Sequence, residues 1–268
     1  MLCIERKAFD LVYELKLTAN EWKHEDANGD NLWHYAARTQ DHRAVKLFEF
    51  LQAQNVPSKG NMQGSSPLHE AVQTCDCSMN SVVEPIEWLA ANVSEIPYDV
   101  YGRTPLHYAF ASRDEFAQQL LTKKVRDPIA VVSILTRNMN KQQLNAADCD
   151  GNTALHLCAF KNSNICAVTL INKGANVFTK NKEGNSPLAL AVLHGSQSVA
   201  LTLIQGNSSI TEQVFFSQPS EMEDNVWKWN GIQKHQKTTV STIPAQIIAR
   251  GGEWEALVYV LLEALGTV

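Results

Sequence analysis

The feature that most constrains this fold is a short motif that occurs five times along the chain. In each copy a turn that ends in glycine is followed, two residues later, by Asn, Ser or Thr and then by a short apolar segment. The five glycines are Gly29, Gly64, Gly102, Gly151 and Gly184, with spacings of 35, 38, 49 and 33 residues. A period of this size predicts a stack of similar units, because one such unit cannot bury its apolar side alone.

Each position of the motif has a physical reason. Glycine adopts positive φ in a tight turn at no steric cost. The Asn, Ser or Thr that follows is a good helix N-cap, and three of the five copies then have proline at the first helical position, where a missing N–H costs nothing. A second apolar segment at helical spacing follows and ends near a glycine, such as Gly174 or Gly206. Each unit is therefore predicted to be a turn, a short helix, a loop and a second helix.

These segments resemble the ankyrin repeat, whose signature is Thr-Pro-Leu-His-x-Ala at a period near 33 residues. Residues 104–109 match it in full, and the resemblance covers residues 26–206. It implies an all-α fold, a solenoid of helix–turn–helix units with hairpin-like turns, in which five clear repeats are flanked by degenerate terminal units. It also implies a non-catalytic protein–protein interaction module that binds its partner in a concave groove.

The repeat pattern divides the chain into four parts. We expect an N-terminal capping half-repeat at 1–25, repeats at 26–206 with an insertion near 124–147, an exposed loop or enlarged finger at 207–240, and a degenerate sixth repeat or C-terminal cap at 241–268. Residues 7–17 are predicted to form a lone outer helix. Asp127 and Pro128 are predicted to open an extended outer helix that runs through Met139.

Composition and charge narrow the class of partner. The formal net charge is -5 without a run of Lys or Arg, which argues against nucleic acid and against anionic membranes. The longest apolar run, residues 256–262, is too short to span a bilayer. Six cysteines in a long chain that is 44% hydrophobic do not indicate a disulfide scaffold. We expect an intracellular protein, cytoplasmic or nuclear.

The residue types that could serve catalysis or metal binding are explained better by the repeat than by a reactive site. The four histidines at 34, 69, 107 and 156 share one repeat position, and the resemblance implies that they bridge neighbouring repeats by hydrogen bonds. Cys75 and Cys77 have no partners at zinc spacing. The sequence contains no Gly-rich phosphate loop and no nucleophile turn. We therefore predict no catalytic residue, no metal, no cofactor and no small-molecule substrate in this chain.

The resemblance assigns partner binding to the hairpin tips and to the outward positions of the first helices. The candidate residues are Tyr35, Arg38, Glu70, Gln73, Tyr101, Arg103, Tyr108, Ser112, Asp150, Asn152, Leu157, Phe160, Lys182 and Asn185. Aromatic residues and Arg are enriched among interface hot spots, although packing within the solenoid is an equal alternative for the aromatics. Trp227 and Trp229 form a second candidate patch. Replacing Tyr108 and Arg103 with alanine is predicted to abolish binding without lowering the melting temperature.

Two alternatives remain open at this point. Residues 127–129, 166–170 and 254–259 resemble the ankyrin region of poly(ADP-ribose) polymerases that carry ankyrin repeats. That resemblance implies that the chain is an accessory region of a larger enzyme, with the NAD chemistry in a domain outside this chain. The half-repeat with which the sequence begins and the apolar segment with which it ends agree with this alternative. The other alternative is a structural spacer without a selective ligand.

Overall fold

The computed structural model describes residues 2–5, 7–15, 21–75, 82–92, 96–110 and 128–205. They divide into two compact units: unit 1 is Met1–Cys149 with Asn172–Ala175, and unit 2 is Asp150–Ile171 with Asn176–Val268. Every regular element within these described ranges is a helix, which confirms the all-α prediction. Ser112, Trp227 and Trp229, and the predicted loop and cap at 207–240 and 241–268, lie outside the described residues.

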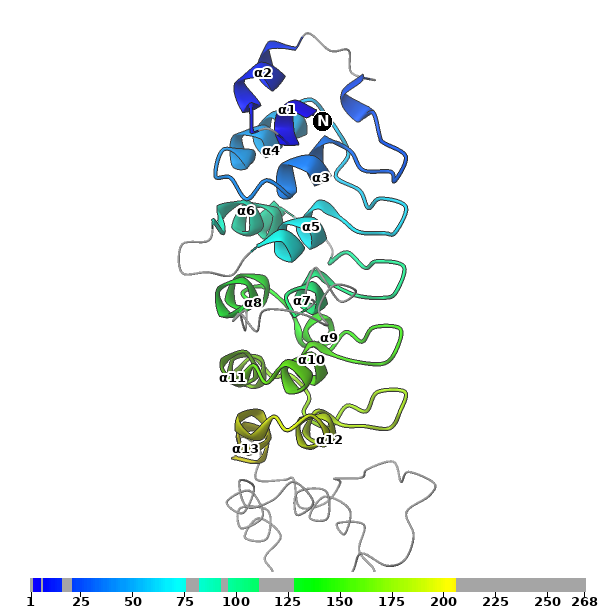
Figure 1. Ribbon diagram of the computed structural model, residues 1–268, viewed down its shortest axis with the longest axis vertical. Coiled ribbons are helices and arrows are strands. Elements are labelled where there is room, and N and C mark those ends of the chain that lie inside the picture. Colours follow the sequence, from blue (N-terminus) through cyan, green and yellow to red (C-terminus); the bar gives the residue numbers. More distant parts are fainter. Residues whose placement is uncertain are drawn as a thin grey trace, which may run out of the picture. The chain divides into compact units, whose positions relative to one another are not determined.

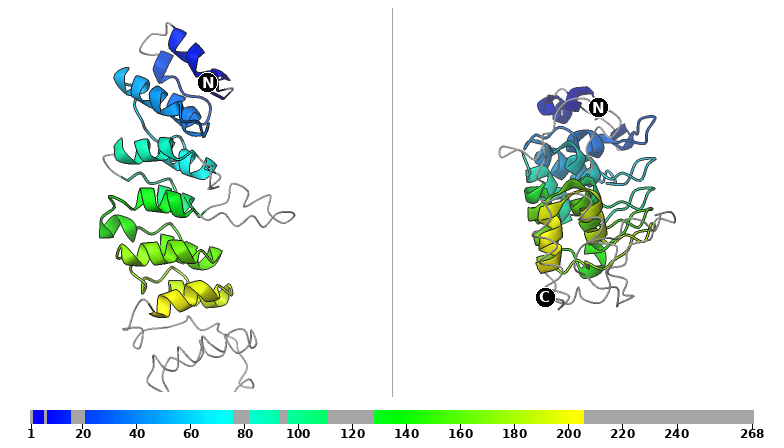
Figure 2. Two further views of the ribbon diagram at one scale, coloured as in Figure 1. Left: turned by 90° about the vertical axis from the view of Figure 1, so that its left-hand side faces the viewer. Right: turned by 60° about the horizontal axis from the view of Figure 1, so that its bottom comes forward.

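Unit 1 consists of helix pairs that form successive layers (Figures 1 and 2). Its elements are α1 (Leu2–Glu5), α2 (Phe9–Glu14), η1 (Glu21–Lys23), α3 (Leu32–Ala37), α4 (Ala44–Ala53), α5 (Pro67–Thr74), α6 (Glu84–Asn92), α7 (Pro105–Tyr108), α8 (Ile129–Leu135) and α9 (Lys141–Leu144). The inner helices α3, α5 and α7 pack on one another in that order, and so do the outer helices α4, α6 and α8. The hairpin turns project from the inner helices, away from the outer ones (Figure 1).

Unit 2 repeats the same arrangement. Its elements are α10 (Ala154–Lys161), α11 (Asn164–Asn172), α12 (Pro187–Leu193) and α13 (Gln197–Gln205). The inner helices α10 and α12 pack side by side, and α13 covers α12. Cys158 and Cys166 are fully buried between the helices, so these cysteines serve as small core residues.

The shared histidine joins each repeat to the next. In the second repeat, the backbone N–H of the N-cap residue Ser66 donates to Nδ1 of His69 at 3.1 Å, and the Ser66 hydroxyl lies 2.9 Å from the same nitrogen. Because Nδ1 accepts, the proton is on Nε2, which donates to the carbonyl of Arg103 at 3.0 Å. The predicted bridging role of the histidine is thus confirmed in this repeat.

The same bridge recurs at two further positions. Nε2 of His34 lies 2.9 Å from the carbonyl oxygen of Ser65, and Nε2 of His156 lies 3.1 Å from that of Asn185. All these rings are inaccessible to solvent. Each bridge therefore fixes the start of an inner helix against the turn of the next repeat, inside a single unit.

The hairpin turns form a second link between repeats. An Asp or Asn opens each turn: the carboxylate of Asp99, for example, accepts from the backbone N–H groups of Tyr101 and Arg103 at 2.9 and 2.8 Å. Successive turns then bond through their backbones: within unit 1, Met62 N–H donates to the Asn28 carbonyl and Val100 N–H to the Gln63 carbonyl. The turns consequently form a continuous ladder in which neighbouring backbones lie in direct contact.

Two details differ from the sequence predictions. The helix expected to run through Met139 ends at Leu135, because Thr136 turns its hydroxyl back to the Val132 carbonyl and Asn140 caps a separate helix, α9, by bonding the N–H of Gln143. The helix expected at 7–17 is the shorter α2, preceded by α1, since Lys7 has a φ of 57° between them. In unit 2, the buried side of α11 is formed by Cys166, Ala167 and Leu170, while Ile165 is exposed. None of the described helices is long and apolar enough to cross a membrane.

We predict that Gly64→Ala destabilises the chain more than Gly102→Ala. Both glycines have nearly the same positive φ, 72° and 71°, so the backbone strain of an alanine is matched. A Cβ at Gly64 would lie 2.9 Å from Cα of Asp99 in the next turn, whereas at Gly102 the nearest atom is 3.6 Å away. Urea unfolding is expected to show a loss of about 1 kcal/mol for Gly102→Ala and at least twice that for Gly64→Ala. Equal losses would show that the turns are not in direct contact.

We also predict that acid weakens the fold through His69. Burial lowers the pKa of this imidazole to about 4, against 6.5 for the free side chain. Between pH 6.5 and pH 4 the His69 imidazole binds a proton in the unfolded chain but not in the folded one. The stabilising contribution of the neutral ring is therefore fully present above pH 6.5, and it is lost as the pH falls toward 4, by up to about 3 kcal/mol. The free energy of unfolding, measured from pH 7 to pH 4.5, is expected to fall less steeply in His69→Gln than in the natural chain. An unchanged slope would contradict a neutral, buried His69.

Candidate functional site: the inner-helix and hairpin face

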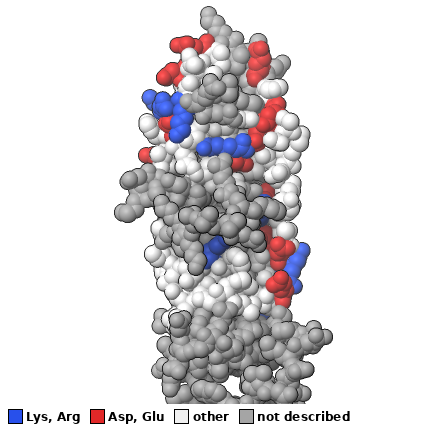
Figure 3. Space-filling view, in the orientation of Figure 1, with Lys and Arg blue, Asp and Glu red and all other residues white. Residues whose placement is uncertain are grey.

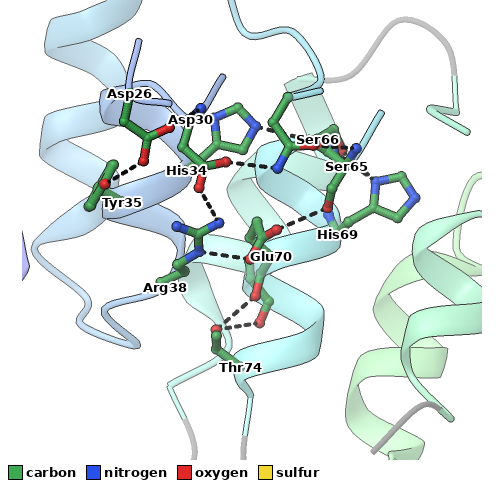
Figure 4. Close-up of polar contacts among 12 residues, drawn as sticks. Asp26, Asp30, His34, Tyr35, Arg38, Ser65, Ser66, His69, Glu70 and Thr74 are labelled. Carbon is green, nitrogen blue, oxygen red and sulfur yellow. Dashed lines mark hydrogen bonds and ion pairs between the residues drawn. The ribbon is translucent and has the colours of Figure 1, made fainter. Parts of the chain in front are cut away.

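An ion network lies at the junction of the first two repeats, on the face formed by the inner helices and hairpin turns of unit 1 (Figure 4). Arg38, at the end of α3, bonds Asp30 in its own turn and Glu70 on α5, with nitrogen–oxygen distances of 2.7 and 2.8 Å. The second oxygen of Glu70 accepts from the Ser65 hydroxyl at 3.0 Å. Both carboxylates are almost buried, so the guanidinium neutralises charges that would otherwise be costly to bury.

In two of the turns, the hydroxyl of a tyrosine on an inner helix donates a hydrogen bond to the aspartate that opens the turn. The Tyr35 hydroxyl donates to Asp26 at 2.8 Å, and the Tyr108 hydroxyl donates to Asp99 at 3.0 Å. Each tyrosine stands nine residues after its aspartate, one position after the histidine of the repeat motif. The repeat thus places a phenol beneath the turn wherever this position is tyrosine.

The third repeat carries an arginine between two aromatic rings. The guanidinium carbon of Arg103 lies 4.8 Å from the centre of the Tyr101 ring and 4.9 Å from that of Tyr108. The same guanidinium pairs with Asp99 at 2.7 Å. Tyr108 is only 6% exposed and packs edge-on against His69, whereas Tyr101 is 52% exposed at the turn. Tyr101 therefore presents its ring to solvent from a position that Arg103 holds in place.

The pKa values on this face follow from these contacts. Burial raises the pKa of Tyr108 to about 12, against the opposing effect of the Arg103 charge. Burial also tends to raise the pKa of Asp99, but hydrogen bonds from Arg103 and Tyr108 outweigh it and the pKa lies below its ordinary value. The Asp99 carboxylate is therefore ionised at neutral pH and already hydrogen-bonded within the protein. In Figure 3, acidic and basic atoms are interspersed on the described surface that faces the viewer, with no extensive area of one sign.

The corresponding face of unit 2 is more apolar. Phe160, at the end of α10, is 48% exposed and packs edge-on against His194, with ring centres 4.4 Å apart. Lys161 lies over the same ring, its ammonium nitrogen 5.2 Å from the ring centre. Leu193 on α12 is 38% exposed. An aromatic ring that is half open to solvent and flanked by a cation offers a contact point for a partner.

The described candidate residues differ in how much surface they present. Glu70, Tyr108 and Asn185 are buried; Tyr35, Arg38, Gln73, Arg103, Asn152 and Leu157 are half-buried; Tyr101, Asp150, Phe160 and Lys182 are exposed. The structure alters the expectation for Tyr108. Because this ring is buried and bonded to Asp99, its replacement by alanine is expected to lower the melting temperature, which the sequence analysis did not foresee.

The sequence analysis missed the carboxylates that hold this face together. Asp26, Asp30 and Asp99 lie in the turns, and each also accepts a hydrogen bond from a side chain on an inner helix or in the same turn. The nine-residue spacing from Asp26 to Tyr35 and from Asp99 to Tyr108 was a usable signal. The described residues contain no group of three His, Cys, Asp or Glu side chains that could hold a metal ion.

Comparisons with known proteins agree with this geometry. A family model described as "Ankyrin repeats (3 copies)" matches residues 126–213. A poly [ADP-ribose] polymerase tankyrase of Caenorhabditis elegans is 44% identical over 278 residues, which cover 99% of this chain and 12% of that protein. The nuclear factor NF-kappa-B p105 subunit of Gallus gallus is 27% identical over 71% of this chain and 18% of its own length. Ankyrin repeat protein OPG189 of Variola virus is 31% identical over 45% of this chain and 19% of its own length.

The stacked helix pairs, the bridging histidines and the turn ladder define an ankyrin-repeat protein, and the family model agrees. Ankyrin repeats are a protein-interaction module. Nearly the whole chain is similar to a segment of a poly(ADP-ribose) polymerase, as the sequence had suggested. The chain spans less than a fifth of the length of each of these relatives.

We predict that Arg38→Met lowers the free energy of unfolding by about 2 kcal/mol. The carboxylates of Asp30 and Glu70 are almost buried, and the substitution removes the cation that pairs with them. Adding Glu70→Gln to this variant is expected to recover part of the loss, whereas Glu70→Gln alone destabilises the natural chain. A double-mutant cycle by urea unfolding measures this coupling. Strictly additive losses would mean that Arg38 and Glu70 do not interact in solution.

Proposed function

We propose that this chain binds other proteins through the inner-helix and hairpin face of each unit, using exposed rings that the repeats of that unit hold in position. The observation that carries the proposal is the contrast between buried and exposed groups on this face. Asp99, Glu70 and Tyr108 are occupied by internal bonds, while Tyr101 and Phe160 are about half exposed on elements that those bonds and the core keep rigid. Preordered aromatic rings bind at a low entropic cost.

On the same face of each unit, the remaining candidate residues would supply a polar rim. In unit 2, Asp150 and Lys182 are exposed at the turns, and Asn152 accepts from the Asn181 amide at 3.0 Å. In unit 1, Gln73 lies half-exposed on α5. A rim of hydrogen-bonding groups around an aromatic centre is the usual anatomy of a protein interface.

A second function is favoured by the similarity to the Caenorhabditis elegans polymerase. The chain would then be the ankyrin segment of a larger ADP-ribosyltransferase and would bring protein substrates to a catalytic domain elsewhere in the polypeptide. The two functions are compatible, since both need the same binding face. The reading frame of the full transcript tests the second: continuation into a catalytic domain supports it, and a stop codon directly after Val268 excludes it.

The binding proposal predicts the effect of two substitutions. Tyr101→Ala and Phe160→Ala are each expected to reduce the capture of partner proteins from cell lysate at least about 10-fold, because each removes an exposed aromatic anchor. Their melting temperatures are expected to stay within about 2 °C of the natural chain, since neither ring is part of the buried core.

Ile165→Ala is the matched control for Phe160→Ala. Ile165 is 56% exposed, but it lies on the outer helix α11. The proteins that the natural chain retains should remain bound to Ile165→Ala and be lost from Phe160→Ala, as measured by quantitative mass spectrometry. Loss from the Ile165 variant alone would move the binding surface to the outer helices.

A further inference from the structure

A cavity lies on the side of unit 1 where the loop after α4 meets α6, apart from the inner-helix and hairpin face. Its volume is about 330 Å³, within the range of ligand sites. The residues that line it are Trp33, Gln52, Asn55, Val56, Pro57, Ser58, Trp88, Leu89 and Asn92. None of them carries a charge.

The base of the cavity is apolar and rigid. Trp33, Val56 and Leu89 are at most 4% exposed. The Trp33 ring lies 6.0 Å from that of Trp88, and both rings also pack on Phe48, at 5.4 Å each. The buried Trp33 ring and the half-buried Trp88 ring therefore form an aromatic base, of which Trp88 presents the larger surface.

Two carbonyl groups of the loop that forms one wall already accept hydrogen bonds. The indole N–H of Trp33 donates to the Val56 carbonyl at 3.0 Å, and the Asn31 amide donates to the Pro57 carbonyl at 3.1 Å. In the part of the chain that the structure describes, the half-buried indole of Trp88 has ring contacts but no acceptor for its N–H. Around it, the side chains of Gln52, Asn55, Ser58 and Asn92 are exposed at the rim.

We propose that this cavity binds an uncharged, proline-rich segment of a partner protein in the polyproline II conformation. Such a segment forms no internal hydrogen bonds, so its carbonyl groups are free to accept from an indole N–H and from side-chain amides. Its proline rings pack against aromatic side chains, which is how proline-rich peptides are recognised elsewhere. A charged segment would lose solvation here without gaining a counter-charge.

Other modes of binding fit the cavity less well. An amphipathic helix needs a long groove with anchors at successive turns, whereas this cavity is bounded by one residue each of α3 and α4, the loop after α4 and the last part of α6. Strand addition needs a sheet edge, and the described residues form no strand. The proposal is independent of binding at the inner-helix and hairpin face.

Titration of the complete ¹⁵N-labelled chain with acetylated decaproline tests the proposal. The indole N–H signal of Trp88, assigned from its loss in Trp88→Phe, is expected to shift with a dissociation constant of up to about 1 mM. Trp88→Phe keeps an aromatic ring but removes the donor, so the remaining signals should report an affinity that is about 5-fold weaker. A Gly-Ser peptide of the same length should cause no shift.

A matched pair of variants tests the location. Asn92→Arg fills the mouth of the cavity, whereas Ala91→Arg adds the same charge at the neighbouring exposed position, which does not line it. Decaproline binding should be lost in Asn92→Arg and retained in Ala91→Arg. No shift of Trp88 at about 5 mM peptide, equal binding to both variants, or a shift with a phenylalanine-containing peptide but not with decaproline would overturn the proposal.

Discussion

The structure depends on a neutral histidine that bonds in two directions. Nδ1 accepts from the start of its own helix, and Nε2 donates to the next repeat, as His69 does between Ser66 and Arg103. Burial lowers the pKa of this ring and so maintains the uncharged form that the geometry requires. The turn ladder adds backbone hydrogen bonds at the same junctions. Together they fix the spacing and orientation of successive turns within a unit, and thereby the positions of the side chains that the turns present.

The charged residues near these junctions form ion pairs within the protein. Arg38 pairs with both Asp30 and Glu70, and Arg103 pairs with Asp99 while lying between two tyrosines. Under the proposed function, a partner would meet rings and rim groups that are held in place, with the buried carboxylates already paired. A surface with many ionisable groups would then act through a few exposed aromatic residues.

Much of this fold could be predicted from the sequence, because each part of the motif has a local cause. Glycine turns, N-caps such as Thr104 and proline at the first helical position each specify a backbone conformation directly. The prediction for the end of α8 was wrong. The apolar residues continue at helical spacing through Met139, but Asn140 caps the separate helix α9. Exposure was harder still: Tyr108 and Tyr101 are both aromatic residues of the third repeat, but only the packing around His69 shows that one is buried and the other open.

Hydrogen–deuterium exchange on the complete chain, with and without a captured partner, tests the central claim most directly. The stacking described here predicts that a bound protein slows exchange in the turns at 99–103 and 181–185 and in the inner helices α5, α10 and α12, while the outer helices α4 and α11 exchange as before. Slower exchange confined to the outer helices, with the turns unchanged, would contradict the account.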